Sequence, residues 1–283
     1  MTTGLASPDR AVVAQHLREA YMEIFPAPGI AAKLAALERG AYVAVTCSPA
    51  RGPEATLALS RELVEAGFRV VPHVAARSVR DRQHLREIMS TIEALGIESL
   101  FVPGGDRAEP VGRYRTALEL LRDISDIGHR LRYVGVAAHP EGHPLADEAT
   151  LLAELERKQE HANYLVTQLC FDAPALGDWL ARVRERGITL PAWIGLPGVI
   201  ERAQLLRTSL RIGVGDSLRF LKRQARSAAR LMSAAVYRPD ALLESLAPIA
   251  ANPAYGVAGY HLFCFNQIEA TESWRRQMLG VLE

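Results

Sequence analysis

Short apolar segments alternate with longer amphipathic segments along the whole chain. Eight of the apolar segments are candidate strands, at residues 20–25, 42–46, 69–73, 99–102, 132–137, 164–169, 191–195 and 257–263. A run such as Tyr42-Val43-Ala44-Val45 lacks polar alternation, which is typical of strands that are covered on both faces in a parallel sheet. The pattern therefore predicts eight buried parallel strands.

The segments between the candidate strands have helical periodicity. Residues 54–66 carry leucines at helical spacings and are followed by Gly67, a residue that commonly ends a helix. Successive strand starts lie about 20 to 34 residues apart until the seventh, after which about 60 residues intervene. This last interval has room for an additional helix near residues 216–232.

A strand-helix unit repeated eight times predicts a closed (β/α)8 barrel of the TIM-barrel class. We expect residues 1–283 to form a single domain of this kind, with an extra helix before the last strand. An open, doubly wound sheet would use the same elements but usually needs a glycine-rich first turn. The first turn here is Phe25-Pro26-Ala27-Pro28-Gly29, and the even strand-helix count favours closure.

Composition narrows the class of protein. Lys and Arg number 33 against 32 Asp and Glu, so a net charge of +1 gives no general attraction to nucleic acid or to an anionic membrane. The three cysteines form no C-x-x-C pair, and an odd number predicts neither a disulfide framework nor a zinc ribbon. With no long apolar run in the sequence, we expect a cytoplasmic protein without a nucleic-acid or membrane partner.

Polar residues follow the candidate strands at their carboxyl ends. In a closed barrel these ends meet at one face, where loops can change without harming the barrel, so polar groups gathered there indicate a ligand site. The residues are Glu23, Thr46, His73, Asp106, His139, His143 and Gln168.

Glu23 lies inside the apolar run Tyr21-Met22-Glu23-Ile24-Phe25. Burial disfavours a charged carboxylate, so an acid in this position is favoured in its protonated form and could donate a proton. The alternative is a structural glutamate that forms a buried ion pair with an arginine.

Two loops after strands allow more than one interpretation. In Pro103-Gly104-Gly105-Asp106 the glycines would let backbone amides approach a flat or phosphorylated ligand, but they also suit a tight turn. His139 and His143 are potential metal ligands, yet two prolines restrict the intervening backbone and no further cluster completes a site. We therefore expect no metal and assign these histidines to hydrogen bonding with a ligand.

A basic stripe occupies the predicted extra helix. Its members recur at spacings of three and four residues, which places them on one side of a helix: Arg219, Lys222, Arg223, Arg226 and Arg230. Such a stripe is either a solvated surface or a site for the anionic tail of a substrate.

The ordered motifs resemble those of the bacterial methylenetetrahydrofolate reductases, from about Met22 to Gln277. The motifs are Met22-Glu23-Ile24-Phe25-Pro26, Val45-Thr46, Pro72-His73, Gly105-Asp106, Pro140-Glu141-Gly142-His143-Pro144, Val166-Thr167-Gln168 and Phe171-Asp172. The resemblance implies that the barrel binds FAD, takes hydride from NADH or NADPH, and reduces 5,10-methylenetetrahydrofolate to 5-methyltetrahydrofolate. It also implies association into a homo-oligomer.

Residue roles follow from the same resemblance. Glu23 would be the acid that opens the imidazolidine ring of the folate, Asp106 would lie between flavin and pterin, and Gln168 would hold the pterin. The basic stripe is not part of the family pattern, and we expect it to meet the folate glutamate through Arg223 and Arg226 in place of a family arginine. The implied flavin contacts are Thr46, His73, Gly105, Asp106, Tyr114, His139, His143 and Lys158.

The sequence also departs from the family pattern. Gly104 replaces an arginine, His139 replaces a tyrosine, and Gln267 stands where an arginine usually follows. These differences leave two alternatives to the flavin enzyme. One is a flavin-independent folate enzyme or methyl-transfer accessory, and the other is a non-catalytic folate-binding barrel.

Overall fold

Eight parallel strands form a barrel in the computed structural model, which describes residues 7–143, 146–211 and 236–283. The strands pair in the order β3-β2-β1-β10-β7-β6-β5-β4. The two edge strands, β3 and β4, meet through a bridge between His73 and Phe101, and the Val74 N–H donates to the Phe101 carbonyl at 2.9 Å. The strands are β1 (Tyr21–Ile24), β2 (Tyr42–Val45), β3 (Arg69–Pro72), β4 (Ser99–Val102), β5 (Tyr133–Ala138), β6 (Tyr164–Thr167), β7 (Ala192–Pro197) and β10 (Val257–Phe263). The predicted (β/α)8 barrel is confirmed.

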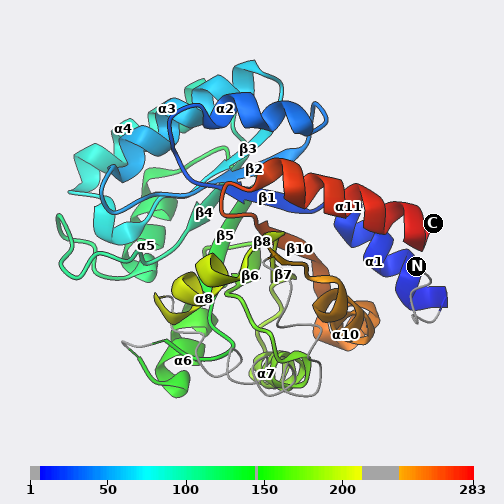
Figure 1. Cartoon of the computed structure of the whole chain (residues 1–283). Helices are drawn as coiled ribbons and strands as arrows, with labels where there is room; N and C mark the ends of the chain where they lie inside the picture. The colour runs from blue at the N-terminus through cyan, green and yellow to red at the C-terminus, as the bar shows by residue number, and fades with distance from the viewer. Residues whose placement is uncertain (1–6, 144–145, 212–235) are drawn as a thin grey trace.

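Helices alternate with the strands and surround the barrel (Figure 1). They are α1 (Ser7–Arg18), α2 (Ile30–Lys33), α3 (Gly52–Glu65), α4 (Arg82–Ala94), α5 (Ala117–Ile127), α6 (Glu148–Lys158), α7 (Ala173–Glu185), α8 (Arg202–Arg211), α10 (Asp240–Ala251) and α11 (Ile268–Leu282). Short 3-10 helices are η1 (Leu34–Ala36), η2 (Ala76–Ser78) and η3 (Pro253–Tyr255). A separate antiparallel ribbon joins β8 (Ile200–Glu201) to β9 (Val236–Tyr237).

In the described residues between β7 and β10 lie both α8 and α10, whereas a standard barrel unit has a single helix. An extra helix before the last strand is therefore present. The position predicted for it, residues 216–232, lies outside the described residues, as does the basic stripe with Arg223 and Arg226.

Aspartates at the starts of several helices fix where each helix begins. The side chains of Asp81, Asp147 and Asp172 accept hydrogen bonds from backbone N–H groups at the starts of α4, α6 and α7. Thr116 and Glu119 form a reciprocal capping box at the start of α5. These caps define the length of each loop between a strand and the next helix, and those loops carry most of the predicted site residues.

Two apolar layers bury the strands on both faces. Met22 and Ile24 of β1 point outward into the core that the surrounding helices cover. The alternate residue Tyr21 points into the barrel, where it joins Ala44, Phe101 and other inward residues of the neighbouring strands. This double burial explains why the strand sequences read as continuous apolar runs.

Inward-facing glycines make room for the large rings inside the barrel. A Cβ atom on Gly135 would overlap the ring of Tyr164, and one on Gly259 would overlap the ring of Trp193. These glycines are required by packing rather than by backbone conformation.

Gly135→Ala is expected to lower the free energy of unfolding by about 1–3 kcal/mol, because the added methyl group forces the Tyr164 ring out of its site. Gly280→Ala is the matched control, since a Cβ at that helical position meets nothing within 4 Å. It should leave stability unchanged or raise it by up to about 1 kcal/mol. Chemical denaturation compares the two, and equal effects would contradict the packing argument.

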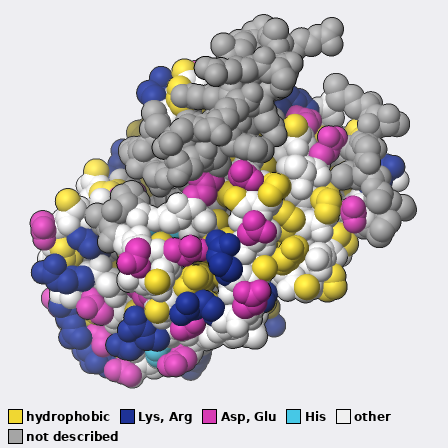
Figure 2. Space-filling view, turned by 90° about the horizontal axis from the view of Figure 1, so that it is seen from below, with side chains coloured by type: hydrophobic (Ala, Val, Ile, Leu, Met, Phe, Trp, Pro, Cys, Tyr) yellow, Lys and Arg dark blue, Asp and Glu magenta, His cyan; other side chains and the backbone are white. Residues whose placement is uncertain are grey.

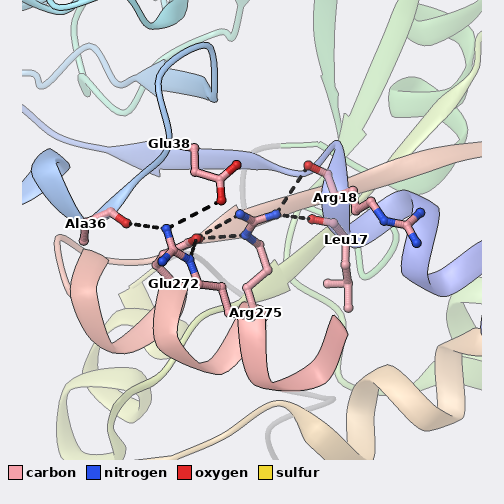
Figure 3. Close-up of polar contacts among 7 residues, drawn as sticks. Leu17, Arg18, Ala36, Glu38, Glu272 and Arg275 are labelled. Carbon is pink, nitrogen blue, oxygen red and sulfur yellow. Dashed lines mark hydrogen bonds and ion pairs between the residues drawn. The ribbon is translucent and has the colours of Figure 1, made fainter. Parts of the chain in front are cut away.

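A buried carboxylate ties the last helix to the first (Figure 3). The side chain of Glu272 is 3% exposed and accepts hydrogen bonds from Arg275 Nε at 2.7 Å and from Arg276 Nε at 2.7 Å. Arg275 Nη1 also donates to the Leu17 carbonyl at 3.0 Å, and Arg276 Nη2 donates to the Ala36 carbonyl at 3.0 Å. The cluster thereby joins α11 to the end of α1 and to η1.

On the face seen in Figure 2, acidic and basic side chains are intermingled across the described surface, in keeping with the net charge of +1. Among the described residues, none of the helices has the length and apolar character needed to cross a membrane.

Candidate active site

Three polar side chains meet inside the barrel near the carboxyl ends of its strands. Glu23 is the third residue of β1, two positions after the inward-facing Tyr21, so its side chain also points into the barrel. His73 directly follows β3, and His261 lies in β10, the strand that pairs with β1. Closure of the barrel brings these residues together.

The carboxylate of Glu23 lies between the two imidazoles. Its Oε2 is 2.9 Å from His261 Nε2, which is hydrogen-bond distance, and 4.0 Å from His73 Nε2. The side chain of Glu23 is 18% exposed, whereas those of His73 and His261 are 6% and 4% exposed. Within the described part of the chain, His73 Nε2 has no hydrogen-bond partner. The carboxylate is thus the group of the three that a ligand can reach.

Aromatic rings support the two histidines. The ring centroid of His73 is 4.6 Å from that of Phe101, and the centroid of His261 is 5.0 Å from that of Phe263. Burial lowers the pKa of His73 to about 4, although the negative charge of Glu23 opposes the shift. His73 is therefore a neutral imidazole at neutral pH.

Glu23 has a different partner from the one considered in the sequence. The structural alternative for this residue was an ion pair with a buried arginine, but the charged or polar partners that the described residues supply are His261 and, at a longer distance, His73. The buried arginine pair is therefore not the arrangement that the described residues form around Glu23.

The loop after β4 places Asp106 on the surface at the rim of the barrel. Asp106 is exposed, and its negative charge opposes the lowering of the His143 pKa that burial causes. Gly105 has φ +95°, and a Cβ on it would lie 2.9 Å from the Cβ of Ala75. The backbone of this loop therefore requires glycine for its own packing, and a role for Gly105 in ligand contact stays a prediction.

The loop after β5 brings the two predicted histidines into contact. The ring centroids of His139 and His143 are 4.9 Å apart in an edge-on arrangement. Burial lowers the pKa of His139 to about 4, and the neighbouring His143 and Lys158 lower it further. Both rings are suited to hydrogen bonding as neutral groups.

Gln168 and Thr46 lie at the same end of the barrel as Glu23. Gln168 follows β6, and its Oε1 accepts a hydrogen bond from the Leu169 N–H at 2.9 Å. Its side-chain amide nitrogen, which can donate, has no hydrogen-bond partner among the described residues. The backbone N–H of Thr46 continues the sheet by donating to the Ile24 carbonyl at 2.9 Å.

Tyr114 and Lys158, two of the implied flavin contacts, have partners within the protein. Tyr114 is 1% exposed, and its hydroxyl donates to Asp123 Oδ2 at 2.6 Å. Lys158 is 8% exposed, and its Nζ lies 3.4 Å from Glu154 Oε1. Burial lowers the pKa of Lys158, while Glu154 opposes the shift. At these two positions the residues do not fit a flavin, because the phenol is enclosed and the ammonium charge is already compensated.

Acid is expected to destabilise the fold through His73 and His139. The pKa of each is lowered to about 4, against an ordinary value of 6.5. Between these values an unfolded chain binds protons that the folded chain does not, so the free energy of unfolding falls as the pH falls from about 6.5 to 4. Denaturation at pH 7 and pH 4.5 should show a smaller difference for His139→Gln than for the wild type. An exposed-site control, His129→Gln, should behave as the wild type, and the same pH dependence in all three proteins would contradict the assignment.

Sequence reasoning missed His261. The available signal was its spacing, because it precedes Phe263 by two positions in a strand that must lie beside β1 for the barrel to close. Glu23, His73 and His261 could also hold a metal ion, because one ligand atom from each lies within 4.8 Å of the others. The sequence placed its metal candidates at His139 and His143 instead.

Residues 30–211 match the family model of methylenetetrahydrofolate reductase, which is more than half of the chain. The chain belongs to the methylenetetrahydrofolate reductase family. His73, Asp106 and Gln168 lie inside the matched segment, whereas Glu23 and His261 lie outside it and are joined to the site by the geometry.

One curated relative is the "Probable methylenetetrahydrofolate reductase (NADPH)" of Caenorhabditis elegans, which is 30% identical over 115 residues. That match covers 38% of this chain and 17% of the relative, so the chain corresponds to a small part of the longer protein.

Two solved structures are similar over 95% of the chain with a TM-score of 0.49. They are a putative lyase/mutase from Burkholderia cenocepacia J2315, at 15% identity and 86% coverage of that chain, and the apo form of a putative deoxyribose-phosphate aldolase from Toxoplasma gondii ME49, at 12% identity and 98% coverage. Neither similarity bears on the activity of this family member.

Proposed function

We propose that this barrel reduces 5,10-methylenetetrahydrofolate to 5-methyltetrahydrofolate, with NADH or NADPH as the hydride donor and Glu23 as the acid. The observation that carries the proposal is the position of Glu23. Its carboxyl group lies inside the mouth of the barrel, partly exposed, and is held by His261 at 2.9 Å. Membership in the family supports a folate substrate. The Glu23 carboxyl would supply the proton that opens the folate ring.

The reaction has two steps, a ring opening and a hydride transfer. The Glu23 carboxyl gives its proton to the ring nitrogen of the folate imidazolidine, the adjacent carbon-nitrogen bond breaks, and its electron pair stays on that nitrogen. The resulting iminium carbon accepts a hydride from the reduced nicotinamide, which leaves as NAD⁺ or NADP⁺. A solvent proton restores the acid. One reduced nucleotide and one proton are consumed for each methyl group formed.

Two further residues would act on the folate. Asp106 is an exposed carboxylate at the rim, and a negative charge there would stabilise the cationic iminium. Gln168 presents an amide at the carboxyl end of β6, and an amide can both donate to and accept from the edge of a pterin ring.

The resemblance also implies FAD, a group that would supply a hydride relay when bound. The enclosed hydroxyl of Tyr114 and the compensated ammonium of Lys158 favour the flavin-independent alternative. We therefore assign the hydride transfer to the nicotinamide nucleotide directly. A flavin phosphate would have to displace Glu154 from Lys158 at a buried position, which costs the energy of a desolvated charge pair.

The test combines a spectrum with an assay. Purified protein is expected to lack the visible flavin absorbance band, and to convert 5,10-methylenetetrahydrofolate with NADH or NADPH into 5-methyltetrahydrofolate, identified by chromatography. Addition of FAD should leave the rate unchanged. A rate that depends on FAD would overturn the flavin-independent route, and absence of product with both nucleotides and with FAD would overturn the reductase assignment itself.

A further inference from the structure

The family resemblance assigns no common role to the two histidines beside Glu23. The motif that contains His261 gives it no role, and His73 was assigned only to flavin contact. Both are nearly inaccessible to a ligand, with side chains 4% and 6% exposed, yet both direct a ring nitrogen at the same carboxylate oxygen. The role of these histidines toward Glu23 rests on the proposed function.

The imidazole of His261 is held rigidly. Its ring centroid lies 6.1 Å from Tyr21, 6.5 Å from Phe101 and 5.0 Å from Phe263. Because β10 pairs with β1 in register from Tyr21 to Glu23, the distance between the imidazole and the carboxylate is set by the sheet rather than by a flexible loop. A donor that is fixed in this way needs no reorganisation when charge develops on its partner.

The two carboxyl oxygens of Glu23 have different surroundings. Oε2 contacts His261 Nε2, and His73 Nε2 lies 4.0 Å away on a buried ring without a hydrogen-bond partner among the described residues. No residue in the described ranges donates to Oε1. Oε1 is therefore the oxygen that is free of protein donors in the described ranges, and the proton that leaves in the reaction is assigned to it.

We propose that His261 and His73 are positioning residues that make Glu23 an effective acid. His261 donates from Nε2 to Oε2 and turns Oε1 toward the substrate. When the O–H bond on Oε1 breaks and the proton moves to the ring nitrogen of the folate, the carboxylate acquires a full negative charge. A small shift then closes the 4.0 Å distance to His73, and a second N–H donor stabilises the anion. Neither histidine gains or loses a proton.

This arrangement favours the transition state over the ground state. A neutral carboxyl group is a weaker hydrogen-bond acceptor than a carboxylate. The contact with His73 therefore stabilises Glu23 little before proton transfer and more after it. The same three side chains could instead bind a divalent metal ion. A metal ion would need both histidine nitrogens unprotonated, so it would remove the hydrogen bonds that the proposal requires.

The first experiment compares His261→Leu with His261→Gln in the full-length protein. The Leu variant loses the donor, and kcat should fall roughly tenfold to hundredfold while KM changes by less than about threefold. The Gln variant keeps an amide N–H near the position of Nε2, and most of kcat should be retained. His84→Gln is the matched control, because His84 is also buried and also contacts a glutamate, Glu54 at 3.2 Å, outside this site. Its kcat and KM should match the wild type.

Several outcomes would overturn the proposal. They are a wild-type kcat in His261→Leu, equal losses in the Leu and Gln variants, a change confined to KM, and an equivalent of tightly bound transition metal whose removal and return abolish and restore turnover. Wild-type turnover is measured first, so that its absence marks a failure of the proposed function instead.

A second measurement does not depend on turnover. Nitrogen NMR of histidine-labelled protein should show His261 protonated on Nε2, with a resonance that moves in Glu23→Ala and stays in place in the control Glu54→Ala. A His261 resonance that is unaffected by Glu23→Ala would overturn the proposal whether or not the reductase activity is found.

Discussion

Glu23→Gln is expected to lower kcat for folate reduction by roughly 10²- to 10⁴-fold, with KM changed by less than about threefold. Glutamine has the shape of glutamate, and its carbonyl oxygen can still accept the hydrogen bond from His261 that Oε2 accepts in the wild type at 2.9 Å. It cannot deliver a proton to the leaving ring nitrogen. The loss therefore falls on the chemical step rather than on binding, and steady-state kinetics with varied folate concentration separate the two.

The control for this variant is Glu54→Gln, which removes a carboxylate that also lies beside a buried histidine, His84 at 3.2 Å. Its kcat should match the wild type. Normal turnover in Glu23→Gln would contradict the acid assignment. Normal folate binding with no turnover in either the wild type or the variant would favour the non-catalytic folate-binding barrel.

Glu272→Leu is expected to lower the free energy of unfolding by about 3–5 kcal/mol. The carboxylate of Glu272 is 3% exposed, and it is the common partner of Arg275 and Arg276 (Figure 3). Removing it leaves the guanidinium of Arg275, itself 13% exposed, as a buried cation without its counter-charge. The contacts to the Leu17 and Ala36 carbonyls lose their anchor at the same time, so α11 loosens from α1 and η1.

The matched control for Glu272 is an exposed ion pair. Glu148 and Arg182 are 2.8 Å apart with side chains that are 51% and 44% exposed, and Glu148→Leu should lower stability by less than about 1 kcal/mol. Denaturant midpoints and thermal unfolding of both variants give the comparison. Similar losses in the two variants would contradict the view that burial gives the Glu272 cluster its importance.

The barrel strands were readable from the sequence because burial on both faces leaves a continuous apolar run. The ranges predicted for 99–102 and 257–263 coincide with β4 and β10, and the other six differ by one or two residues at an end. The ribbon of β8 and β9 could not be predicted, because two-residue strands carry no periodicity. Helix α1 was also missed, since it precedes the first strand and belongs to no repeated strand-helix unit.

The site was only partly readable. Glu23 and His73 could be found because each interrupts or ends an apolar strand. The contact of Glu23 with His261, however, joins two residues that are 238 positions apart in sequence. Motif matching also assigned Tyr114 and Lys158 to a cofactor, although each has a partner within the fold. For Lys158 the signal was present, because Glu154 lies four residues earlier on the same helix.

The most direct test of the reductase assignment is the fate of a labelled hydride. The protein, purified without flavin, is supplied with 5,10-methylenetetrahydrofolate and with NADH or NADPH carrying deuterium at the transferable position, and the product is analysed by mass spectrometry. The account predicts 5-methyltetrahydrofolate with one deuterium in its methyl group, formed by the wild type and at least a hundredfold more slowly by Glu23→Gln. Unlabelled methyl product, or no product at all, would contradict it.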